Sequence, residues 1–396
     1  MFNSTLGINI YKNMKLKNKH LSLDFNKSPM TIAWEITQAC AFKCIHCRAQ
    51  AQYHRNKKEL TTKEGLLLID QIKKLGALIL VITGGDPMVR KDLYTFIRYA
   101  KKIGLKVGIS PSATNLLNYK SIEKLKESGV DIIHISLDGA TDEVHDKFRG
   151  FTGSFKKTLE IIKYINKLNI PLQIGTTISK RNVNNLTDIK NVLLKFNIYI
   201  WSLFFLVPTG RALTKEMISD YEQESVLEWI FKISQNVKFL IRTTAAQNYR
   251  RVFISNITEK MYSSQNKKIL YEGKGYSFNL LNDKIHKGVN DGHGFCFIDH
   301  IGNVYPSGFL QIPTDNVKNN NIKHIYQNSN LFIKLRSKNL LKGKCGICNF
   351  KYVCGGSRAR AYSMHSDFLE SDFNCAFLPF IKELNYKNIF ITNFLF

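Results

Sequence analysis

Seven of the eight cysteines in this 396-residue sequence fall into two clusters, and cysteine thiolates are metal ligands and redox groups. The first cluster is the segment CAFKCIHC, in which Cys40, Cys44 and Cys47 have C-x3-C-x2-C spacing. Three thiolates in one loop can bind three irons of a [4Fe–4S] cluster and leave the fourth iron open to a chelating ligand. A zinc site that takes His46 or His54 as its fourth ligand fits the same spacing. A disulfide would leave one thiol unpaired, and a long chain without an export signal disfavours it.

The second cluster lies near the C-terminus and contains Cys345, Cys348, Cys354 and Cys375, spaced C-x2-C-x5-C-x20-C. Four thiolates complete the ligand set of either a structural zinc ion or a [4Fe–4S] cluster, and the spacing alone favours zinc. The eighth cysteine, Cys296, stands apart from both clusters. It is interpreted as a buried inert thiol, a labile metal ligand or a substrate contact.

The elements that must position the first cluster are predicted from the alternation of apolar runs and amphipathic stretches between residues 31 and 207. Thr61 and Glu64 have capping-box spacing at the start of one amphipathic stretch, which Gly76 ends, and Ser154 is the expected cap of another. The alternation predicts an α/β fold with a parallel sheet and right-handed crossovers. Strands are expected at 31–36, 77–83, 105–110, 131–137, 171–178 and 198–207, and helices at 60–76, 91–104, 118–129, 154–168 and 185–196.

A longer helical segment is expected at 214–236 and a further strand at 237–242. A complete eightfold barrel would need two more strand–helix units after the sixth strand, and the remaining sequence is not expected to supply them.

Polar and glycine-containing motifs recur close to the predicted strand ends. The carboxyl ends of parallel strands meet at one edge of a sheet, where the active sites of α/β proteins assemble. Taken singly, Gly84–Gly85 fits an ordinary turn and Asp138 fits a helix cap. Their common placement favours a binding site. The motifs are TGGDP (83–87), SPSATN (110–115), SLDG (136–139), HDKFRG (145–150) and VPTGRA (207–212).

Together with these motifs, the CxxxCxxC loop resembles that of the radical S-adenosylmethionine (SAM) superfamily, whose pattern is CxxxCxφC with φ usually aromatic. His46 stands at the φ position here, which departs from the pattern. The resemblance covers residues 30–210 and implies a partial (β/α)6 TIM-like barrel. It also implies that Cys40, Cys44 and Cys47 hold a [4Fe–4S] cluster that binds SAM. SAM would be cleaved reductively to a 5′-deoxyadenosyl radical, which abstracts a hydrogen atom from the substrate.

The resemblance extends to the SAM-binding motifs. TGGDP looks like the family's Gly-Gly-Glu-Pro stretch, whose backbone meets the methionine amino group of SAM, with Asp86 in place of Glu. SPSATN is expected to reach the SAM ribose or carboxylate, Arg149 to pair with the carboxylate, and VPTGRA to lie at the adenine and substrate edge. The implied SAM-binding residues are His46, Gly84, Gly85, Asp86, Pro87, Ser112, Thr114, Asn115, Ser136, Asp138 and Arg149.

The second cysteine cluster looks like the C-terminal half of a SPASM-type auxiliary-cluster domain. The resemblance implies that its four cysteines hold a second [4Fe–4S] cluster. A complete SPASM pattern holds two auxiliary clusters and begins with a Cys, a Gly and then a further Cys. After Cys296, the position of that further Cys is Ser307. This departure argues against a complete second auxiliary cluster and leaves Cys296 as only a possible ligand.

The spacing of the second cluster resembles that of the radical SAM enzymes of alternative heme and d-type heme biosynthesis, which remodel propionate side chains of tetrapyrroles. It implies an oxidoreductase that oxidises or decarboxylates such side chains. Arg358 and Arg360 alternate in CGGSRARAY; on a strand they would share a face and bind a carboxylate, or else they pair with surface acids. Together with Arg211 they are the candidate substrate-binding residues.

Two alternative functions are open at this point. A SPASM-type maturase would have the same clusters but would modify a ribosomally made peptide. A zinc-stabilised nucleic-acid-binding protein would use the net charge of +26, which arises because 57 Lys and Arg outnumber 31 Asp and Glu. However, the basic residues are scattered among many Asn and Ile, as on a solvated surface, and no known nucleic-acid module occurs. Nucleic acid is therefore not an expected partner.

The expected partners are a small-molecule or peptide substrate and an acidic electron donor such as ferredoxin or flavodoxin. The apolar runs fall short of the roughly 20 residues that span a bilayer, so a cytoplasmic protein with no membrane span is predicted. The predicted organisation is a basic N-terminal extension at 1–29, a radical SAM partial barrel at 30–245, a linker region at 246–290, a SPASM- or twitch-like auxiliary-cluster domain at 291–380 and a C-terminal tail at 381–396.

Overall fold

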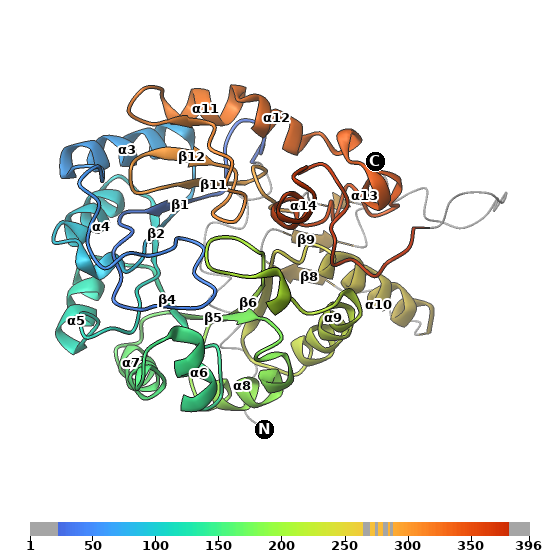
Figure 1. Ribbon diagram of the computed structural model, residues 1–396, viewed down its shortest axis with the longest axis horizontal. Helices are drawn as coiled ribbons and strands as arrows, with labels where there is room; N and C mark the ends of the chain where they lie inside the picture. The colour runs from blue at the N-terminus through green and yellow to red at the C-terminus, as the bar shows by residue number, and fades with distance from the viewer. Residues whose placement is uncertain (1–22, 264–269, 274–275, 280–283, 286–287, 380–396) are drawn as a thin grey trace.

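The computed structural model describes residues 23–263, 270–273, 276–279, 284–285 and 288–379. Within these ranges the main element is a ten-stranded sheet with the strand order β13-β12-β11-β1-β2-β3-β4-β5-β6-β7, which curves into an open barrel with helices around it (Figure 1). The predicted C-terminal tail and most of the predicted N-terminal extension lie outside the described residues.

The six predicted strands and the helices between them are confirmed. Adjacent strands from β1 to β7 pair in parallel, as right-handed βαβ units require. The strands are β1 (Thr31–Glu35), β2 (Ile79–Thr83), β3 (Lys106–Ile109), β4 (Ile132–Ser136), β5 (Leu172–Ile178), β6 (Ile200–Phe205) and β7 (Leu240–Thr244). The helices are α3 (Thr62–Leu75), α4 (Leu93–Lys102), α5 (Tyr119–Glu127), α6 (Asp142–Arg149), α7 (Ser154–Lys167), α8 (Leu186–Leu193), α9 (Asp220–Ser234) and α10 (Tyr249–Ser263).

Local sequence signals fix the start and the end of α3. The hydroxyl of Thr61 accepts a hydrogen bond from the backbone N–H of Glu64, and the Glu64 carboxylate accepts one from the backbone N–H of Thr61. Gly76 follows the helix with a φ of 90°, a left-handed conformation that glycine adopts without a steric penalty. The predicted capping box and stop are therefore confirmed.

The predicted cap of α7 is wrong. Ser154 is the first residue of the helix, and Gly153 stands at the N-cap position. Asp146, in the last turn of α6, provides the acceptor instead: its carboxylate accepts hydrogen bonds from the backbone N–H groups of Gly153 and Phe155 and from the Ser154 hydroxyl. A residue eight positions upstream of Ser154 thus caps the helix, which a local pattern does not reveal.

The sequence after α10 returns to the barrel. β11 (Phe295–Ile298) pairs in parallel with β1, and β12 (Asn303–Tyr305) and β13 (Asp315–Asn316) continue the sheet in antiparallel fashion. The further strand expected at 237–242 is present as β7, and α10 follows it. β11 extends the parallel sheet on its other side but is followed by the antiparallel strand β12, so it does not start another strand–helix unit. The predicted boundary near residue 290 separates regions of different composition, but residues 295–316 belong to the main sheet.

Short elements complete the chain. β8 (Leu270–Gly273), β9 (Tyr276–Asn279) and β10 (Lys284–Ile285) form a small antiparallel sheet. The C-terminal segment contains α11 (Ile322–Asn328), α12 (Asn330–Arg336), α13 (Gly343–Ile347) and α14 (Arg358–His365). α11 packs against α3 on the outside of the barrel, so the C-terminal segment reaches back over the first βα unit (Figure 1).

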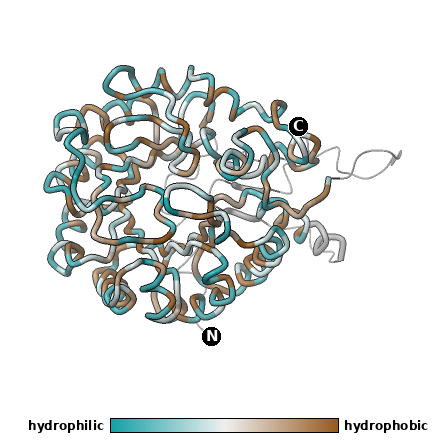
Figure 2. Tube along the Cα trace, in the orientation of Figure 1, coloured by the Kyte–Doolittle hydropathy of each residue, from teal (hydrophilic) through white to brown (hydrophobic). Residues whose placement is uncertain are grey.

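The core lies between the sheet and the surrounding helices. Hydrophobic and hydrophilic residues alternate along the outer helices (Figure 2), and the hydrophobic ones pack against the strands. Gly65 in α3 allows close packing there, because a Cβ at this position would lie 2.6 Å from side-chain atoms of Trp34 and Phe96. Among the described residues, we find no helix with the length and apolar character needed to cross a membrane.

Candidate active site

A cavity of about 640 Å³ occupies the interior of the barrel. Side chains alternate between the two faces of a strand, so every second residue points inward. On β1, Thr31 and Ala33 line the cavity, whereas Ile32 between them is buried in the hydrophobic core. On β11, Phe295 and Phe297 line it in the same way. The barrel is therefore hollow enough to hold a sizeable ligand.

The first cysteine cluster lies in the loop after β1, and its three thiols line this cavity. Two of the sulfurs accept backbone hydrogen bonds, from the N–H of Phe42 to Cys40 Sγ and from the N–H of Ala51 to Cys47 Sγ, each at 3.4 Å. Such N–H donors stabilise negative charge on sulfur. The loop thus presents three sulfurs to one space, with donors placed for thiolates.

Arg211, a candidate substrate-binding residue, braces this loop. Its backbone N–H donates to the carbonyl of Cys47 at 3.0 Å, and its Nε donates to the carbonyl of Cys44 at 2.9 Å. Nη1 donates to the carbonyl of Ala51 at 3.2 Å. Arg211 does not line the cavity, so its contacts hold the cysteine loop from the side that faces away from the cavity.

Burial raises the pKa of the Cys44 thiol to about 11, and the nearby Arg149 guanidinium acts in the opposite direction. Burial also raises the pKa of Cys40. These thiols are thus protonated at neutral pH until a metal binds them, because metals deprotonate the thiols that they ligate. Three inward-facing sulfurs with N–H donors and a cation nearby fit a [4Fe–4S] cluster with one open iron.

His46 lines the cavity, and its ring centroid lies 4.5 Å from that of Phe148. Burial is the main cause that lowers the pKa of His46 well below its ordinary value, so the imidazole is neutral. It therefore packs as an aromatic ring, as the φ position of the cysteine motif requires. His54, the other alternative zinc ligand, is exposed next to Tyr53 and does not line the cavity.

Gly84 and Gly85 follow β2 and line the cavity beside the cysteine loop. A Cβ on Gly84 would lie 2.7 Å from the carbonyl oxygen of Thr37, and one on Gly85 would lie 2.5 Å from the carbonyl oxygen of Ala39. The Gly85 N–H donates to the Thr37 carbonyl at 2.8 Å. Both residues are therefore glycines because two segments of the backbone approach each other here too closely for a side chain. This contact fixes the end of β2 against the segment that leads to Cys40.

Asp86 is buried and ties the ends of β2 and β3 together. Its carboxylate accepts hydrogen bonds from the Thr114 hydroxyl at 2.8 Å and from the N–H of Met88 at 3.1 Å. Burial raises the pKa of Asp86, against these hydrogen bonds. Of the predicted residues in this region, Ser112 lines the cavity, with its Oγ 3.6 Å from Cys40 Sγ. Asp86, Pro87 and Thr114 lie behind the cavity wall, and Asn115 is exposed.

Asp138 and Arg149 form a buried ion pair, with 3.2 Å between Arg149 Nη1 and Asp138 Oδ2. The Asp138 carboxylate also accepts from the N–H of Thr177 at 2.7 Å. Arg149 lines the cavity, as does Ser136 at the end of β4. The pair therefore places a cation at the cavity wall near the cysteine thiols, where an anionic ligand group would meet it.

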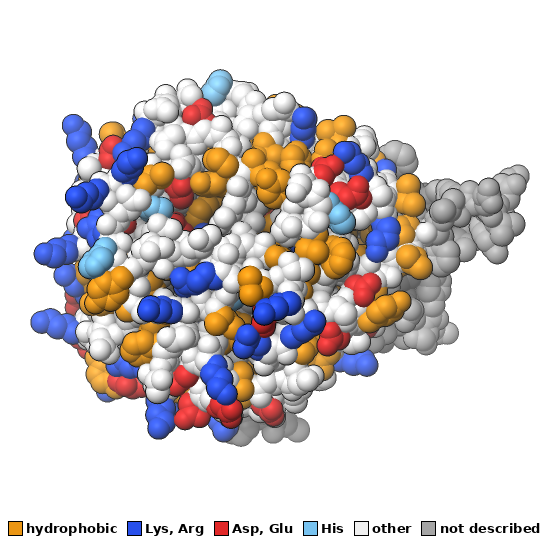
Figure 3. Space-filling view, viewed as in Figure 1, with side chains coloured by type: hydrophobic (Ala, Val, Ile, Leu, Met, Phe, Trp, Pro, Cys, Tyr) orange, Lys and Arg blue, Asp and Glu red, His pale blue; other side chains and the backbone are white. Residues whose placement is uncertain are grey.

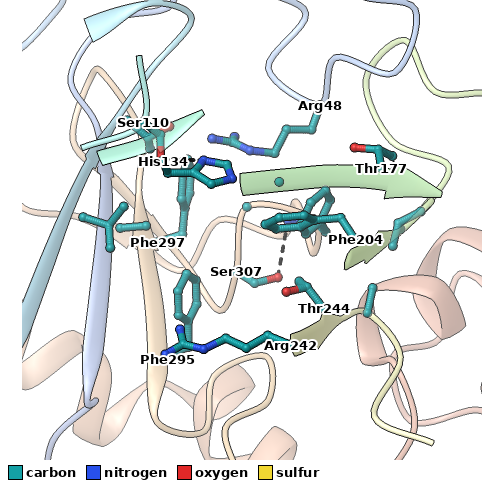
Figure 4. A pocket seen from close by; sticks show the side chains of 18 of the residues that line it. Arg48, Ser110, His134, Thr177, Phe204, Arg242, Thr244, Phe295, Phe297 and Ser307 are labelled. Atoms are coloured by element: carbon teal, nitrogen blue, oxygen red, sulfur yellow. Dashed lines mark hydrogen bonds between the residues drawn. The ribbon is translucent and has the colours of Figure 1, made fainter. Parts of the chain in front are cut away.

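Sequence reasoning missed the residues in the middle of the cavity, which Figure 4 shows. Arg48, which directly follows the last cysteine of the loop, pairs with Glu35 at 3.0 Å and lies 4.3 Å above the Phe297 ring. His134 on β4 is hydrogen-bonded through Nδ1 to Ser110 Oγ at 3.1 Å. Burial lowers the pKa of His134 to about 4, so the ring is neutral. His134 could have been predicted from the alternation of side chains along a strand, because it lies two residues before the predicted Ser136 and so faces the same side of β4.

Arg242 on β7 extends into the same cavity from another side. In the view of Figure 4, the hydroxyl groups of Ser307 and Thr244 appear between Arg242 and Arg48. Among the described residues, the charged side chains that line the cavity are four arginines and one acidic residue, and the other lining side chains are mainly apolar or aromatic. The charged residues are Arg48, Arg149, Arg242, Arg250 and Asp291. This charge balance suits a ligand that carries carboxylates on an apolar body.

The four cysteines of the second cluster line a second, smaller cavity. The N–H of Phe350 donates to Cys348 Sγ and the N–H of Gly356 donates to Cys354 Sγ, each at 3.4 Å. Burial raises the pKa of Cys354 to about 12. In the part of the chain that the structure describes, no three His, Cys, Asp or Glu side chains converge as the ligands of a single metal ion do. The four sulfurs with their N–H donors fit a closed [4Fe–4S] cluster.

Arg358 and Arg360 do not have the shared face that a strand would give them, because residues 358–365 form α14. Both side chains are buried and neither lines the large cavity. Arg360 pairs with Asp372 at 2.9 Å and also donates to the carbonyl oxygen of Ala245. The Arg358 guanidinium donates to backbone carbonyls and to Cys345 Sγ. Both guanidinium groups are thus bonded to other residues of the protein. Through these contacts the two arginines join the C-terminal segment to the barrel and to the second cluster.

Cys296 does not belong to either cluster in the structure. It lies on β11 between the two phenylalanines that face the cavity, so its own side chain points to the other face of the sheet. It pairs in register with Ile32 and is completely buried in the hydrophobic core. Its possible role as a metal ligand is therefore corrected to that of a core residue.

Sequence comparison supports the interpretation of the first cluster. The profile of the Radical SAM superfamily matches residues 34–193. The AdoMet-dependent heme synthase of Methanosarcina barkeri (strain Fusaro) is 36% identical over 89% of this chain and 97% of its own length. The Fe-coproporphyrin III synthase of the same organism is 28% identical over 91% of each chain.

Among solved structures, this chain is similar to Streptococcus suis SuiB, which has been crystallised with S-adenosylmethionine and with the precursor peptide SuiA. The TM-score is 0.67 with 17% identity, and the match to the S-adenosylmethionine complex covers 93% of this chain and 82% of SuiB. At 17% identity, the similarity shows a shared fold only, and this fold extends from the barrel to the C-terminal segment.

Proposed function

This chain belongs to the radical SAM superfamily, and from this premise we propose that it oxidatively decarboxylates the propionate side chains of an iron tetrapyrrole. The relatives named for heme and Fe-coproporphyrin synthesis match it over most of its length and most of theirs. The proposal names the substrate class of this radical SAM enzyme as a flat, apolar ring with several carboxylates.

The observation that carries the proposal is the cavity inside the barrel. It has a volume of about 640 Å³, with Phe204, Phe295 and Phe297 on its walls. Arg48 and Arg242 approach it from opposite sides in Figure 4. A tetrapyrrole would stack its ring on the aromatic side chains and direct its carboxylates to the guanidinium groups.

For the cofactor end of the cavity, we propose that Cys40, Cys44 and Cys47 hold a [4Fe–4S] cluster and that SAM binds next to it. When bound, the cluster and SAM supply the one-electron chemistry that removes a hydrogen atom from an unactivated carbon. The backbone of Gly84 and Gly85 supplies close-range contacts, and Arg149 meets the SAM carboxylate. The remaining residues of the predicted SAM-binding set act by holding these groups in place.

The chain's own residues also have to orient the substrate. Arg48 is fixed by Glu35 at 3.0 Å and by its stacking on Phe297, so it presents a guanidinium in one orientation. Arg242 is carried by β7, a strand of the main sheet. One cation held by its contacts and one carried by a strand select one placement of a propionate relative to the cofactor end. The apolar walls exclude water from the reacting carbon.

We further propose that Cys345, Cys348, Cys354 and Cys375 hold an auxiliary [4Fe–4S] cluster. Two features support it: the four thiols line one cavity, and backbone N–H groups donate to their sulfurs. Val353 and Ala359, on either side of Cys354 in sequence, also line the large cavity, so the two sites adjoin.

An acidic electron donor such as ferredoxin or flavodoxin and a cytoplasmic location complete the proposal. Lys and Arg side chains are spread over the face seen in Figure 3, with acidic ones among them, which suits electrostatic docking of an acidic carrier. This dispersion does not mark out a path for a nucleic-acid backbone. The alternative of a peptide substrate draws on the fold likeness to SuiB and on relatives of lower identity, such as the PqqA peptide cyclase of Bradyrhizobium diazoefficiens, which is 24% identical over 89% of this chain.

The test is anaerobic incubation with SAM, a reductant and iron coproporphyrin III, followed by mass spectrometry. Loss of CO2 from one or more propionates, together with 5′-deoxyadenosine, is expected. The matched control is Cys44→Ala, which should give neither product. Production of 5′-deoxyadenosine with no change in mass of iron coproporphyrin III or of other propionate-bearing tetrapyrroles would refute the substrate class and favour a peptide.

A further inference from the structure

We infer that Arg358 is a positioning residue that raises the reduction potential of the auxiliary cluster through a direct hydrogen bond to its ligand Cys345. The inference rests on the proposed auxiliary cluster and goes beyond it, because it states in which direction the reduction potential of this cluster is shifted and which side chain shifts it. An upward shift would make the cluster an acceptor of electrons rather than a donor.

The first support is the geometry of Arg358, which is completely buried. Its Nη2 donates to Cys345 Sγ at 3.4 Å. Its Nη1 donates to the carbonyl oxygens of Phe368 at 2.9 Å and of Glu370 at 2.6 Å, which fix the guanidinium plane. The side chain is therefore held so that one N–H points at a sulfur of the second cysteine cluster.

A glycine makes this contact possible. A Cβ on Gly356 would lie 2.5 Å from Arg358 Nη2 and 3.0 Å from Cys345 Sγ. Gly356 also has a φ of 61°, a conformation that other residues rarely adopt. The CGGSR segment thus leaves room for the guanidinium to reach the sulfur.

The second support is the charge of Arg358. Its neighbour on the same helix, Arg360, is buried to the same degree but pairs with the Asp372 carboxylate at 2.9 Å. The contacts found for Arg358 in the described structure are carbonyl oxygens and one sulfur. Carbonyls satisfy hydrogen bonds but do not neutralise a cation, and an isolated buried charge is costly. The charge of Arg358 also helps to lower the pKa of the Asp367 carboxyl, but Asp367 is half-buried and pairs with Lys342. A thiolate at Cys345 would supply a negative charge in direct contact with the guanidinium.

The surroundings reinforce the positive potential. Burial, with the charges of Arg358 and Arg250 beside it, lowers the pKa of Lys338 to about 8. A [4Fe–4S] cluster with four thiolate ligands is an anion in both oxidation states, and it gains one negative charge on reduction. Buried cations stabilise the more negative, reduced state most, because the interaction is weakly screened there. The potential of the couple therefore rises.

Arg358 acts on one of the four ligands in particular. Cys348 and Cys354 accept their hydrogen bonds from backbone N–H groups. Cys345 accepts one from the N–H of Asp372 at 3.4 Å and a second from Arg358, which carries a full charge. Charge-assisted hydrogen bonds are roughly twice as strong as neutral ones. Removal of Arg358 should thus have more effect than the loss of any backbone donor.

A raised potential fits the electron balance of the proposed reaction. A propionate that has lost one hydrogen atom at its β-carbon forms a vinyl group when the bond to its carboxylate breaks: CH•–CH2–COO⁻ becomes CH=CH2, CO2 and one electron. The oxidised auxiliary cluster, [4Fe–4S]²⁺, would accept that electron and become [4Fe–4S]⁺. Arg358 stabilises this product state by the charge argument above.

The experiment is a redox titration of the full-length holoenzyme, followed by electron paramagnetic resonance with and without SAM. The signal that SAM does not alter belongs to the auxiliary cluster. Arg358→Gln removes the charge and should shift the midpoint potential of this signal downward, whereas Arg358→Lys, which keeps the charge, should stay closer to the wild type. Lys323→Met on α11 removes an exposed charge and is the control.

Equal potentials in Arg358→Gln and Lys323→Met, with the iron content unchanged, would overturn the inference while the proposed auxiliary cluster stands. If Arg358→Gln loses the auxiliary cluster, the midpoint potential of that cluster is measured in Lys338→Met instead. A lowered potential would support the stabilisation of the reduced cluster by nearby buried cations, and an unchanged potential would refute it. A wild-type enzyme with the iron of one cluster and no SAM-insensitive signal would instead refute the auxiliary cluster itself.

Discussion

The Arg149 guanidinium lies 3.2 Å from the Asp138 carboxylate, and both side chains are buried next to the first cysteine cluster. Asp138 follows β4 and is held by the N–H of Thr177 at the end of β5, whereas Arg149 is the last residue of α6. The ends of two strands therefore fix the position of a cation on a helix. Arg149 faces the cavity from that fixed position, ready to bind an anionic group.

Asp138→Asn keeps the shape of the side chain but removes its charge, so Arg149 loses its counterion and its fixed orientation. We expect about a tenfold weaker affinity for SAM, or roughly 1.4 kcal/mol, with the iron content unchanged. Equilibrium binding of SAM under anaerobic conditions measures the effect. Glu143→Gln is the control, because Glu143 lies on the same helix in an exposed pair with Lys147. SAM affinities that agree between the two variants would contradict the proposed role of the ion pair.

Substitutions in the two cysteine clusters should have different effects on SAM cleavage and on iron content. Cys44→Ala leaves the first cluster without one thiolate, and we expect it to abolish SAM cleavage. Cys348→Ala should lose about half of the iron, one of two clusters, and still cleave SAM in the absence of substrate. Iron analysis and 5′-deoxyadenosine measurement on anaerobically purified protein provide the readouts. A Cys348→Ala variant with its full iron content would mean that the second cluster of cysteines does not hold iron.

Cys296 provides a matched cysteine that should not affect the metal content. Since it is fully buried in the core, Cys296→Ala removes packing contacts and leaves a small void. We expect the free energy of unfolding to fall by about 1 kcal/mol while iron content and SAM cleavage stay at wild-type values. Chemical denaturation and iron analysis test both parts. Loss of iron in this variant would show that Cys296 serves a cluster despite its orientation.

Local periodicity predicted the barrel well, because each βα unit forms from one continuous segment with its own stop signals. The capping box at Thr61 and the left-handed Gly76 are examples in which neighbouring residues alone determine the geometry. The pairing of β11 with β1 could not be found in this way, since it joins Thr31 to Phe295 across most of the chain. No local pattern records such a long-range register.

The site was predictable to the extent that its chemistry lies in short motifs. The cysteine spacing indicated two sets of metal ligands, and each set does line one cavity. Arg48 and Arg242 were missed because an arginine within a loop or strand has no motif, and only the closed barrel shows that they face the same space. The alternation of Arg358 and Arg360 would place both on one face only in a strand, whereas the segment is a helix, so their contacts could not be predicted from the spacing.

His300 should make stability depend on pH. Its Nδ1 lies 3.0 Å from Glu35 Oε1. Burial lowers the pKa of His300, but the hydrogen bond to Glu35 and the charges of Glu35, Asp299 and Glu59 together outweigh it, so the net pKa lies above the ordinary value of 6.5. The folded protein thus favours the protonated ring. This stabilisation is fully present below about pH 6.5 and is lost as the pH rises through the raised folded-state pKa.

His300→Gln removes this contribution while it retains a polar side chain. We expect the difference in unfolding free energy between wild type and variant to be larger at pH 5.5 than at pH 9. Urea denaturation of both proteins across this range measures it. A difference that does not change with pH would mean that Glu35 does not hold a proton on His300 in the folded state.

Arg242 offers the most direct test of the substrate proposal, because it lines the cavity from β7 (Figure 4) and is not one of the residues proposed to hold the cluster or SAM. Arg242→Gln removes a cation that would bind a propionate, so we expect the affinity for iron coproporphyrin III to fall about tenfold, as for one charge-assisted hydrogen-bonded pair. Absorbance titration of the tetrapyrrole measures this without any turnover. Arg181→Gln is the control, since Arg181 pairs with Glu216 on the surface. If the two variants bind iron coproporphyrin III equally well, its carboxylates do not contact Arg242, and the ring must lie elsewhere in the cavity or outside it.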